Sequence, residues 1–414
     1  MNEIKIIEAL QRINIWWEGA FALEFKPREI YEEIKKFLSK RQILALVGLR
    51  RTGKTTLMLK IIEDALENIE RKNIVYFSFD DFKDIKLYDV VKNYEKLQQR
   101  DTRKGSYLFL FDEIQKIENW EEQIKRLYDE NNKIKIIISG SESLFIRKKS
   151  RESLAGRLYE FHIKTLNFRE FLLFKGKKFD NLLLYREEIL KEFQNFIVSN
   201  GFPEIITEER ETAGKYIKEN VIERIIYRDI PQIVPVGDPS LLEALFKILL
   251  EDPGEIINLE ELGKELGMTR QTVSIYLDYL EKSFLIRKLY NYSRNPRKTH
   301  RRAKKYYPTI VSSDFIDKRE LFGKVFETIL VNQLNAEFFW RDSFKNEVDI
   351  IMPSPLTALE IKSGEIKERD IVSLKKFVEK FKPIKAFILS YDIERSTEKI
   401  QAIPFYKYLL RRIT

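Results

Sequence analysis

Residues 48–55, GLRRTGKT, have the residue types and spacing of a loop that binds phosphates. Glycines let the backbone curl so that its N–H groups face an anion, and the following helix adds the positive end of its dipole. In such a loop Lys54 reaches the β- and γ-phosphates of a nucleotide, and the Thr55 hydroxyl ligates Mg²⁺. An apolar run before the motif and a helical pattern after it argue against a chance match in a glycine-containing turn. ATP and Mg²⁺ are therefore the expected cofactors.

Other positions of this loop are expected to line the same nucleotide. They are Gly48, Arg51, Thr52, Gly53 and Thr56. The two arginines of the loop, Arg50 and Arg51, have a second interpretation, because an arginine on a loop is most often simply exposed to solvent.

An acidic pair, Asp112-Glu113, ends the apolar run YLFLF. An aspartate at this position can hold Mg²⁺ through water, and the neighbouring glutamate can orient or deprotonate the attacking water. Acidic pairs after strands are common. This pair follows the phosphate loop by one predicted strand and one predicted helix, and that spacing makes it the expected partner of the loop.

Two further polar positions are candidates for the same site. Ser139 ends the next apolar run, KIKIIISG, where it can sense the γ-phosphate or form an ordinary turn. Arg157, in LAGRL, can serve as an arginine finger, contributed within the chain or by a neighbouring molecule. The second arrangement would require a homo-oligomer.

Four segments, GLRRTGKTTL, FLFDEIQKIENWEE, ISGSESL and SLAGRL, together resemble a prokaryotic, largely archaeal family of AAA-type ATPases. That family is related to the signal-transducing P-loop ATPases, and the resemblance covers nearly the whole chain. It implies an ATPase core followed by a winged helix and a nuclease-like C-terminal domain.

Residues 258–289 predict a helix-turn-helix. Asn258 and Thr269 are typical N-caps of its two helices. Outward positions at the start of the second helix carry Arg270, Gln271 and Ser274, and such side chains suit base edges and phosphates. Winged helices also serve as protein-contact or lid modules, which is the alternative interpretation.

A basic run follows the predicted helix-turn-helix. Residues 294–305, RNPRKTHRRAKK, contain seven Lys or Arg and no acid, which favours DNA, duplex or branched, as the partner. Many such runs are only solvated loops. The side chains expected to contact DNA are Arg297, Lys298, Arg301 and Arg302.

Carboxylates recur near the C-terminus, in EVD (347–349) and EIK (360–362), on two predicted strands. Residues two apart on a strand share a face, so Glu360 and Lys362 point the same way, and a hairpin can bring Asp349 beside them. Two carboxylates with a lysine can hold Mg²⁺ and activate water against a phosphodiester.

Glu327, on the preceding predicted helix, can complete this group. The order of elements resembles the PD-(D/E)XK nuclease fold, with Asp349 and Glu360 as metal ligands, although Val348 stands where the motif's name has proline. A salt-bridged hairpin on a solvated face is the alternative.

Composition narrows the chemistry further. The chain of 414 residues has a net charge of +9, too small an excess to indicate a partner by itself. It has no cysteine and only His162 and His300, which excludes disulfides, thiolate catalysis and histidine-rich metal sites. Any metal must therefore be a hard ion held by carboxylates and phosphates. The charged N-terminus is not a signal peptide, and no apolar run approaches about 20 residues, so we expect a cytoplasmic protein without membrane segments.

These observations predict an α/β protein: a P-loop AAA-type parallel-sheet core with a helical subdomain, a winged helix-turn-helix and a C-terminal restriction-endonuclease-like α/β domain. The expected parts are an N-terminal helical segment (1–40), the ATPase core (41–165), the helical subdomain (166–240), the winged helix (241–293) and a basic linker with the nuclease-like domain (294–414).

The expected function is an ATP-hydrolysing, DNA-binding enzyme, either an ATP-regulated, metal-dependent DNA nuclease or another DNA-processing enzyme. The alternative is a non-catalytic regulator, in which the ATPase is a nucleotide switch and the last domain only binds DNA or protein. Metal-dependent DNA cleavage distinguishes the two.

Overall fold

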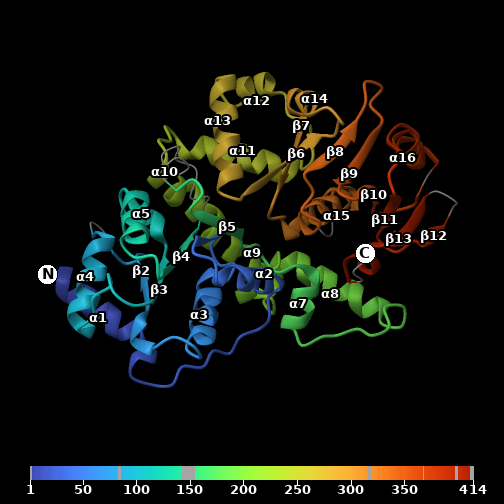
Figure 1. Cartoon of the computed structure of the whole chain (residues 1–414). Coiled ribbons are helices and arrows are strands. Elements are labelled where there is room, and N and C mark those ends of the chain that lie inside the picture. Colours follow the sequence, from blue (N-terminus) through green and yellow to red (C-terminus); the bar gives the residue numbers. More distant parts are fainter. Residues whose placement is uncertain are drawn as a thin grey trace. The chain divides into compact units, whose positions relative to one another are not determined.

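The computed structural model describes residues 2–82, 85–141, 154–315, 319–366, 368–396 and 400–410 (Figure 1). Backbone contacts divide the chain into two compact units. The first unit consists of Met1–Thr165 and Asp229–Pro235, and the second of Leu166–Arg228 and Val236–Thr414. The chain therefore leaves the first unit, returns to it for seven residues and leaves again.

A parallel five-stranded sheet forms the centre of the first unit, with the strand order β2-β3-β4-β1-β5. The strands β1 to β4 are almost continuously apolar and buried, as expected for a parallel sheet covered by helices on both faces, whereas β5 at one edge is largely exposed. The strands are β1 Ile43–Val47, β2 Ile74–Ser78, β3 Tyr107–Asp112, β4 Ile134–Gly140 and β5 Leu158–His162.

Helices alternate with these strands along the chain. The N-terminal segment is fixed to the sheet because the indole N–H groups of Trp16 and Trp17 both donate to the carbonyl of Ile74, at 3.1 and 2.8 Å. The α-helices are α1 Asn2–Ile13, α2 Glu29–Leu38, α3 Lys54–Ala65, α4 Leu87–Gln98, α5 Trp120–Glu130 and α10 Ile230–Ile233, and the short 3₁₀ turns are η1 Ile15–Trp17, η2 Arg71–Asn73 and η3 Ile114–Lys116.

An eight-stranded mixed sheet, with the order β12-β13-β11-β10-β9-β8-β6-β7, organises the second unit. The hairpins β6–β7, β8–β9 and β9–β10 are antiparallel, whereas β10–β11 and β6–β8 are parallel. The strands are β6 Ile286–Asn291, β7 Lys304–Pro308, β8 Phe338–Arg341, β9 Glu347–Pro353, β10 Leu356–Lys362, β11 Lys385–Ser390, β12 Arg395–Ser396 and β13 Gln401–Pro404.

In the second unit, helices α7 to α13 precede the strands of this sheet in the chain, and α14 to α17 lie between or after them. Its α-helices are α7 Phe168–Phe174, α8 Arg186–Ser199, α9 Arg210–Ile217, α11 Pro239–Glu251, α12 Leu259–Glu265, α13 Arg270–Lys282, α14 Pro296–Arg301, α15 Arg319–Gln333, α16 Glu368–Phe381 and α17 Phe405–Leu410. Its short turns are η4 Pro203–Ile205, the π-helical η5 Lys218–Ile222 and η6 Ile225–Asp229, and η7 Ser313–Phe315.

One apolar core joins segments that the sequence analysis treated separately. Phe193 of α8 and Phe405 of α17 have ring centroids 4.2 Å apart, and both belong to a buried cluster with Phe326 of α15 and Leu359 of β10. A second buried apolar cluster includes Trp340 of β8 and Phe377 of α16. The segments 166–228, 241–293 and 294–410 therefore share one packed unit.

The basic segment is not the linker that we expected. Its residues form α14 and the first half of β7, and β7 pairs with β6 at one edge of the large sheet. Separately, no helix within the described ranges is both long and apolar enough to cross a lipid bilayer.

Candidate functional site

The loop between β1 and α3 holds its lysine against its own backbone. The Lys54 ammonium donates to the carbonyls of Gly48 and Leu49, at 3.1 and 2.8 Å, and the Thr52 hydroxyl donates to the Leu49 carbonyl at 2.9 Å. Burial lowers the pKa of Lys54, and the nearby carboxylates of Asp112 and Glu113 oppose this effect. The loop is thus folded around a buried cation to which no carboxylate of the described residues is hydrogen-bonded.

Two neighbours fix the shape of the loop. A Cβ on Gly48 would fall 2.1 Å from the carbonyl oxygen of Ile163, so only glycine permits this close approach of the backbone. The buried Arg28 guanidinium, just before α2, donates to the carbonyls of Thr52 at 2.9 Å and Lys164 at 2.8 Å. Arg28 could not be predicted from the sequence, because an arginine at a helix start has no motif around it.

Hydrogen bonds gather the predicted metal ligands around Asp112. One carboxylate oxygen accepts from the Thr55 hydroxyl at 2.7 Å and from the Tyr76 hydroxyl at 2.8 Å. The other accepts from the Ser139 hydroxyl and from the Glu113 N–H. Ser139 reaches this position because β4 lies between β1 and β3 in the sheet. Thr55 and Asp112 are therefore placed to hold a hard cation whose shell nucleotide phosphates would complete.

Glu113 has the environment of a general base. Its φ of 54° lies in the left-handed region, which is uncommon for glutamate and recurs at functional sites. Its carboxylate accepts from the Gln115 amide at 2.6 Å, and that amide also donates to the Ser141 hydroxyl at 3.1 Å. Burial raises the pKa of Glu113, against the opposing charge of Lys54, which makes the carboxylate a stronger proton acceptor.

The remaining predicted nucleotide contacts are Arg51, Gly53 and Thr56. Arg51 and Thr56 are exposed on the loop and on α3, and Gly53 caps that helix with a left-handed backbone at φ 91°. All three therefore lie on the segment between β1 and the first turn of α3.

Arg157 is not at the nucleotide site of its own chain. Its carbonyl accepts from the N–H of Ile43, the first residue of β1, and its side chain lies 3.5 Å from Asp129. The phosphate loop follows the last residue of β1, about 13 Å away along the strand. Arg157 thus lies at the amino-terminal end of the strands, a position that does not support an arginine finger contributed within the chain. Only a contribution from a neighbouring molecule stays a prediction.

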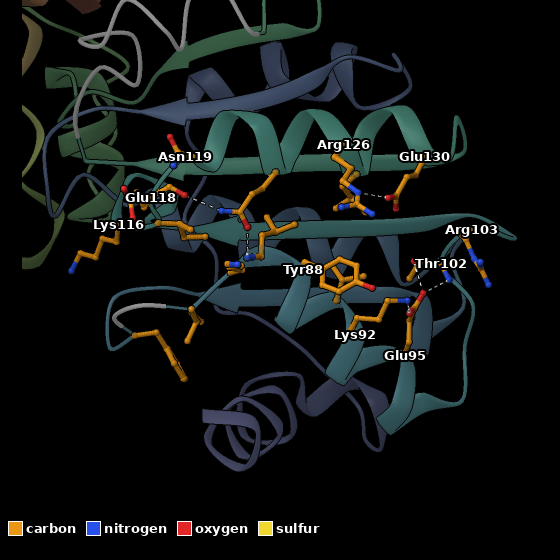
Figure 2. A pocket seen from close by; sticks show the side chains of 18 residues that line it. Tyr88, Lys92, Glu95, Thr102, Arg103, Lys116, Glu118, Asn119, Arg126 and Glu130 are labelled. Carbon is orange, nitrogen blue, oxygen red and sulfur yellow. Dashed lines mark hydrogen bonds and ion pairs between the residues drawn. The ribbon is translucent and has the colours of Figure 1, made fainter. Parts of the chain in front are cut away.

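A cavity of 740 Å³ lies elsewhere in the first unit, beside α4 and α5. Figure 2 shows the exposed Tyr88 ring within it, with the Lys92 ammonium 5.4 Å and the Arg126 guanidinium 5.5 Å from the ring centroid. Both cations are paired, Lys92 with Glu95 and Arg126 with Glu130. No residue of the phosphate loop is among the described residues that line this cavity, so it is separate from the nucleotide site.

In the second unit, the C-terminal carboxylates converge where β9 pairs with β10. The Lys362 ammonium lies 2.9 Å from one oxygen of Glu360, and Asp349 accepts from the N–H of Ile361 at 2.7 Å. The other oxygen of Glu360 is buried without a hydrogen-bond partner. Burial, and next the charge of Asp349, raise the pKa of Glu360. An unpartnered buried oxygen beside a second carboxylate favours a cation or a proton at this point.

A lysine that the sequence analysis did not assign to this cluster completes it. The buried Lys305 ammonium of β7 pairs with Glu347 and lies 3.8 Å from Glu327, and the Tyr307 hydroxyl donates to Glu327 at 2.6 Å. Burial by itself would lower the pKa of Lys305, but the charges of Glu327 and Glu347 outweigh burial and raise that pKa. Burial, followed by the charge of Asp349, raises the pKa of Glu327 to about 7. The alternation in KKYYP was the available signal, since it puts Lys305 and Tyr307 on one face of a strand.

This arrangement is not a ready-made metal cage. Among the residues that the structure describes, no three His, Cys, Asp or Glu side chains are grouped so that they could hold a metal ion. Asp349 and Glu360 would need oxygens from a bound phosphate to complete a metal shell.

The predicted DNA contacts lie on α13 and on α14. Helix α13 packs with α11, α12 and strand β6, which pairs with β7. Thr269 caps α13 by accepting from the N–H of Thr272 at 3.1 Å. A groove of 470 Å³ brings Arg270, at the start of α13, together with Arg301 and Arg302. Of the other predicted contacts, Gln271 and Ser274 are exposed on α13, and Arg297 and Lys298 are exposed on α14. None of these four lines the groove among the described residues.

The strand order, the phosphate loop and the acidic pair together have the geometry of a P-loop ATPase of the AAA type. Residues 40–172 match the family model described as an AAA domain, which supports that class. Residues 190–309 match a model described as a domain of unknown function, DUF8612.

Relatives extend the similarity beyond the ATPase region. The uncharacterized protein MJ1544 of Methanocaldococcus jannaschii is 26% identical over 415 residues, which cover 93% of this chain and 92% of the relative. MJ1637, an uncharacterized protein of the same organism, is 28% identical over 426 residues, covering 92% and 87%. An uncharacterized protein of Haemophilus influenzae is 28% identical over 278 residues, covering 64% and 66%.

Substitutions in the nucleotide site should separate binding from hydrolysis. We expect Lys54→Ala to abolish ATP binding, because the buried cation that faces the phosphates is lost. Glu113→Gln should bind ATP yet hydrolyse it roughly 10² to 10⁴ times more slowly, because a positioned base is lost. Equilibrium binding of a fluorescent ATP analogue and single-turnover hydrolysis measure the two effects. Wild-type turnover in the Glu113→Gln protein would show that another group is the base.

Adjacent lysines of β7 provide a matched test of the buried cluster. Lys305→Met should lower the free energy of unfolding by about 3–5 kcal/mol, because it leaves Glu327 without its cation and leaves Glu347 with Arg341 alone. Lys304→Met, one residue away and facing the basic groove, should leave it nearly unchanged. Urea denaturation of the full chain measures both, and equal effects would contradict the ion-pair assignment.

Proposed function

We propose that the protein is an ATP-hydrolysing DNA-processing enzyme, in which the first unit binds and hydrolyses ATP and the second binds DNA and cuts it with a divalent metal. The nucleotide part rests on the P-loop geometry and on the match to an AAA domain. The DNA part rests on the side chains of the second unit.

One observation carries the DNA part: β7 contributes to two different sites. Lys304 and Tyr306 line the basic groove with Arg270 and Arg301. Lys305 and Tyr307, which alternate with them, contact the carboxylate cluster. Because successive side chains of a strand point to opposite faces, one strand links a surface suited to phosphates with a group of carboxylates suited to a metal.

The basic groove supports DNA as the partner. Four cations line it, namely Arg270, Arg301, Arg302 and Lys304, and the acid that faces them is Glu260, 3.4 Å from Arg270. In this proposal α12, α13 and the β6–β7 hairpin act as a winged helix-turn-helix. Exposed Gln271 and Ser274 on α13 would then read base edges, and the basic groove would hold the backbone.

The carboxylate cluster supports phosphodiester cleavage. Asp349 and Glu360 would hold the metal, which supplies Lewis-acid polarisation of the phosphate when bound. Lys362, 2.9 Å from Glu360, is placed to neutralise charge that develops on the phosphate. Glu327, held by Tyr307, would orient the nearby groups. The order of the elements, a helix with Glu and two strands with Asp and ExK, is like that of the PD-(D/E)XK nucleases.

A specific observation also favours the second candidate function, a regulator without nuclease activity. Lys305 already places a cation among the carboxylates, as described above. Lys305 and Lys362 offset part of the negative charge of the four carboxylates, so the cluster can serve as a structural element without metal. In that case the second unit would bind DNA or protein under the control of the nucleotide state.

The basic groove makes DNA affinity depend on salt in a predictable way. Each phosphate contact contributes about 0.9 to the slope of log affinity against log salt, so Arg301→Gln with Lys304→Gln should reduce that slope by roughly 2. Titration of labelled duplex and branched DNA at several salt concentrations measures it. Lys178→Gln, an exposed lysine of the same unit, is the control and should change nothing. An unchanged slope in the double variant would place the contact elsewhere.

Cleavage itself distinguishes the two candidate functions. We expect Mg²⁺- or Mn²⁺-dependent cutting of duplex or branched DNA, stimulated by ATP. Asp349→Ala or Lys362→Ala should remove it while ATP hydrolysis and DNA affinity stay near wild type. A protein inert towards duplex, single-stranded and branched DNA with both metals and ATP would support the regulator. Cleavage that persists in Asp349→Ala would indicate a contaminant or a different site.

A further inference from the structure

An ion pair ties the phosphate loop to a distant part of the sequence. Arg50 lies in the loop, four residues before Lys54, and its guanidinium donates to both carboxylate oxygens of Asp229, at 3.1 and 3.0 Å. The side chains are 11% and 5% exposed, so water does not screen the pair. The arginine is therefore held in one orientation rather than free in solvent.

Asp229 occupies an unusual place in the chain. It is the last residue of the π-helical turn η6, and α10 begins directly after it. It is also the first residue of the segment Asp229–Pro235, which belongs to the first unit although the residues before and after it belong to the second. π-Helical turns are rare and recur at functional sites, because they displace one side chain from the regular helical position.

Arg50 lies in the loop after β1, and Glu113, the group expected to activate water, follows β3 at the same end of the parallel sheet. The Arg50 side chain is largely buried, which opposes its charge, yet the carboxylates of Asp229 and then Glu113 raise the pKa of Arg50. Burial lowers the pKa of Lys54, and the charges of Glu113 and Asp229 oppose this effect. In P-loop ATPases the loop lysine and the water-activating group lie on either side of the terminal phosphate, so an arginine held in this loop at the same end of the sheet can reach the γ-phosphate.

We propose that Arg50 is the arginine that contacts the γ-phosphate in its own chain, and that Asp229 is the positioning residue that holds its guanidinium there. This inference rests on the ATP-binding half of the proposed function and is independent of the DNA half. It assigns to the phosphate loop the role that the sequence analysis gave to Arg157. It also makes the segment Asp229–Pro235 sensitive to whether the γ-phosphate is present.

The first test is hydrolysis together with nucleotide preference. Arg50→Ala should lower kcat roughly 10³-fold, as loss of an arginine finger does, and should weaken a non-hydrolysable ATP analogue while leaving ADP affinity near wild type. Arg126→Ala, which removes a surface arginine paired with Glu130, is the control. It should leave kcat and the ratio of ATP-analogue to ADP affinity unchanged. Wild-type kcat and an unchanged ratio of ATP-analogue to ADP affinity in Arg50→Ala would overturn the proposal.

The second test addresses Asp229 and a purely structural role. Asp229→Asn should lower kcat with little effect on ADP affinity, and the double variant Arg50→Ala/Asp229→Asn should be no slower than Arg50→Ala, because both act through one contact. If the pair only fixes the loop, both variants should weaken ADP and the ATP analogue equally, and that result would also overturn the proposal.

A third variant covers failure to fold. Arg50→Lys keeps the charge in the loop but cannot make the bidentate contact, so it should bind both nucleotides and hydrolyse ATP slowly. If the wild-type protein hydrolyses no ATP, the proposed ATPase function fails, but the ATP-analogue to ADP ratio of the Arg50 variants still decides whether Arg50 contacts the γ-phosphate.

Discussion

Parallel pairing of β1, β4 and β3 is the constraint on which the nucleotide site depends. Parallel neighbours end at the same edge of the sheet, so the loop after Val47, Ser139 near the end of β4 and Asp112 at the end of β3 must meet there. The hydrogen bonds from Thr55 and Ser139 to Asp112 are the direct consequence. The same rule puts Arg157, which precedes β5, at the opposite, amino-terminal end of the strands.

Much of the nucleotide site could be predicted because its residues lie in short motifs whose spacing reflects one loop and one strand end. The residues that support it could not. Arg28 contacts Thr52 of the loop from 24 positions away in the sequence, and Asp229 contacts Arg50 from 179 positions away. No local sequence pattern marks either residue. The position of Arg157 could not be predicted for the same reason, since the motif names a residue type but not the end of the sheet where it lies.

In the second unit the sequence indicated the carboxylates but not their cation. The EVD and EIK strands were recognisable by alternation, and they pair as an antiparallel hairpin. The basic segment was interpreted as a linker because Lys and Arg usually mark solvated chain. Burial of Lys305 reverses that interpretation: a lysine can enter a core when two glutamates offset its desolvation. Its neighbours Lys304 and Arg301 remain on the groove side, so composition alone could not separate the two roles.

Two buried lysines, Lys54 and Lys305, differ in a way that bears on function. Lys54 is bonded to loop carbonyls and burial lowers its pKa, so its charge is poorly compensated and an arriving polyphosphate gains a strong partner. Lys305 has two carboxylates, which raise its pKa, so its charge is already compensated. The first unit is thus built to take up an anion. In the carboxylate cluster of the second unit, Lys305 and Lys362 already offset part of the negative charge, and a metal would gain only the unpartnered oxygen of Glu360 and its neighbour Asp349. A phosphate bound to that metal is what would make its binding favourable, which ties any chemistry there to the presence of the substrate.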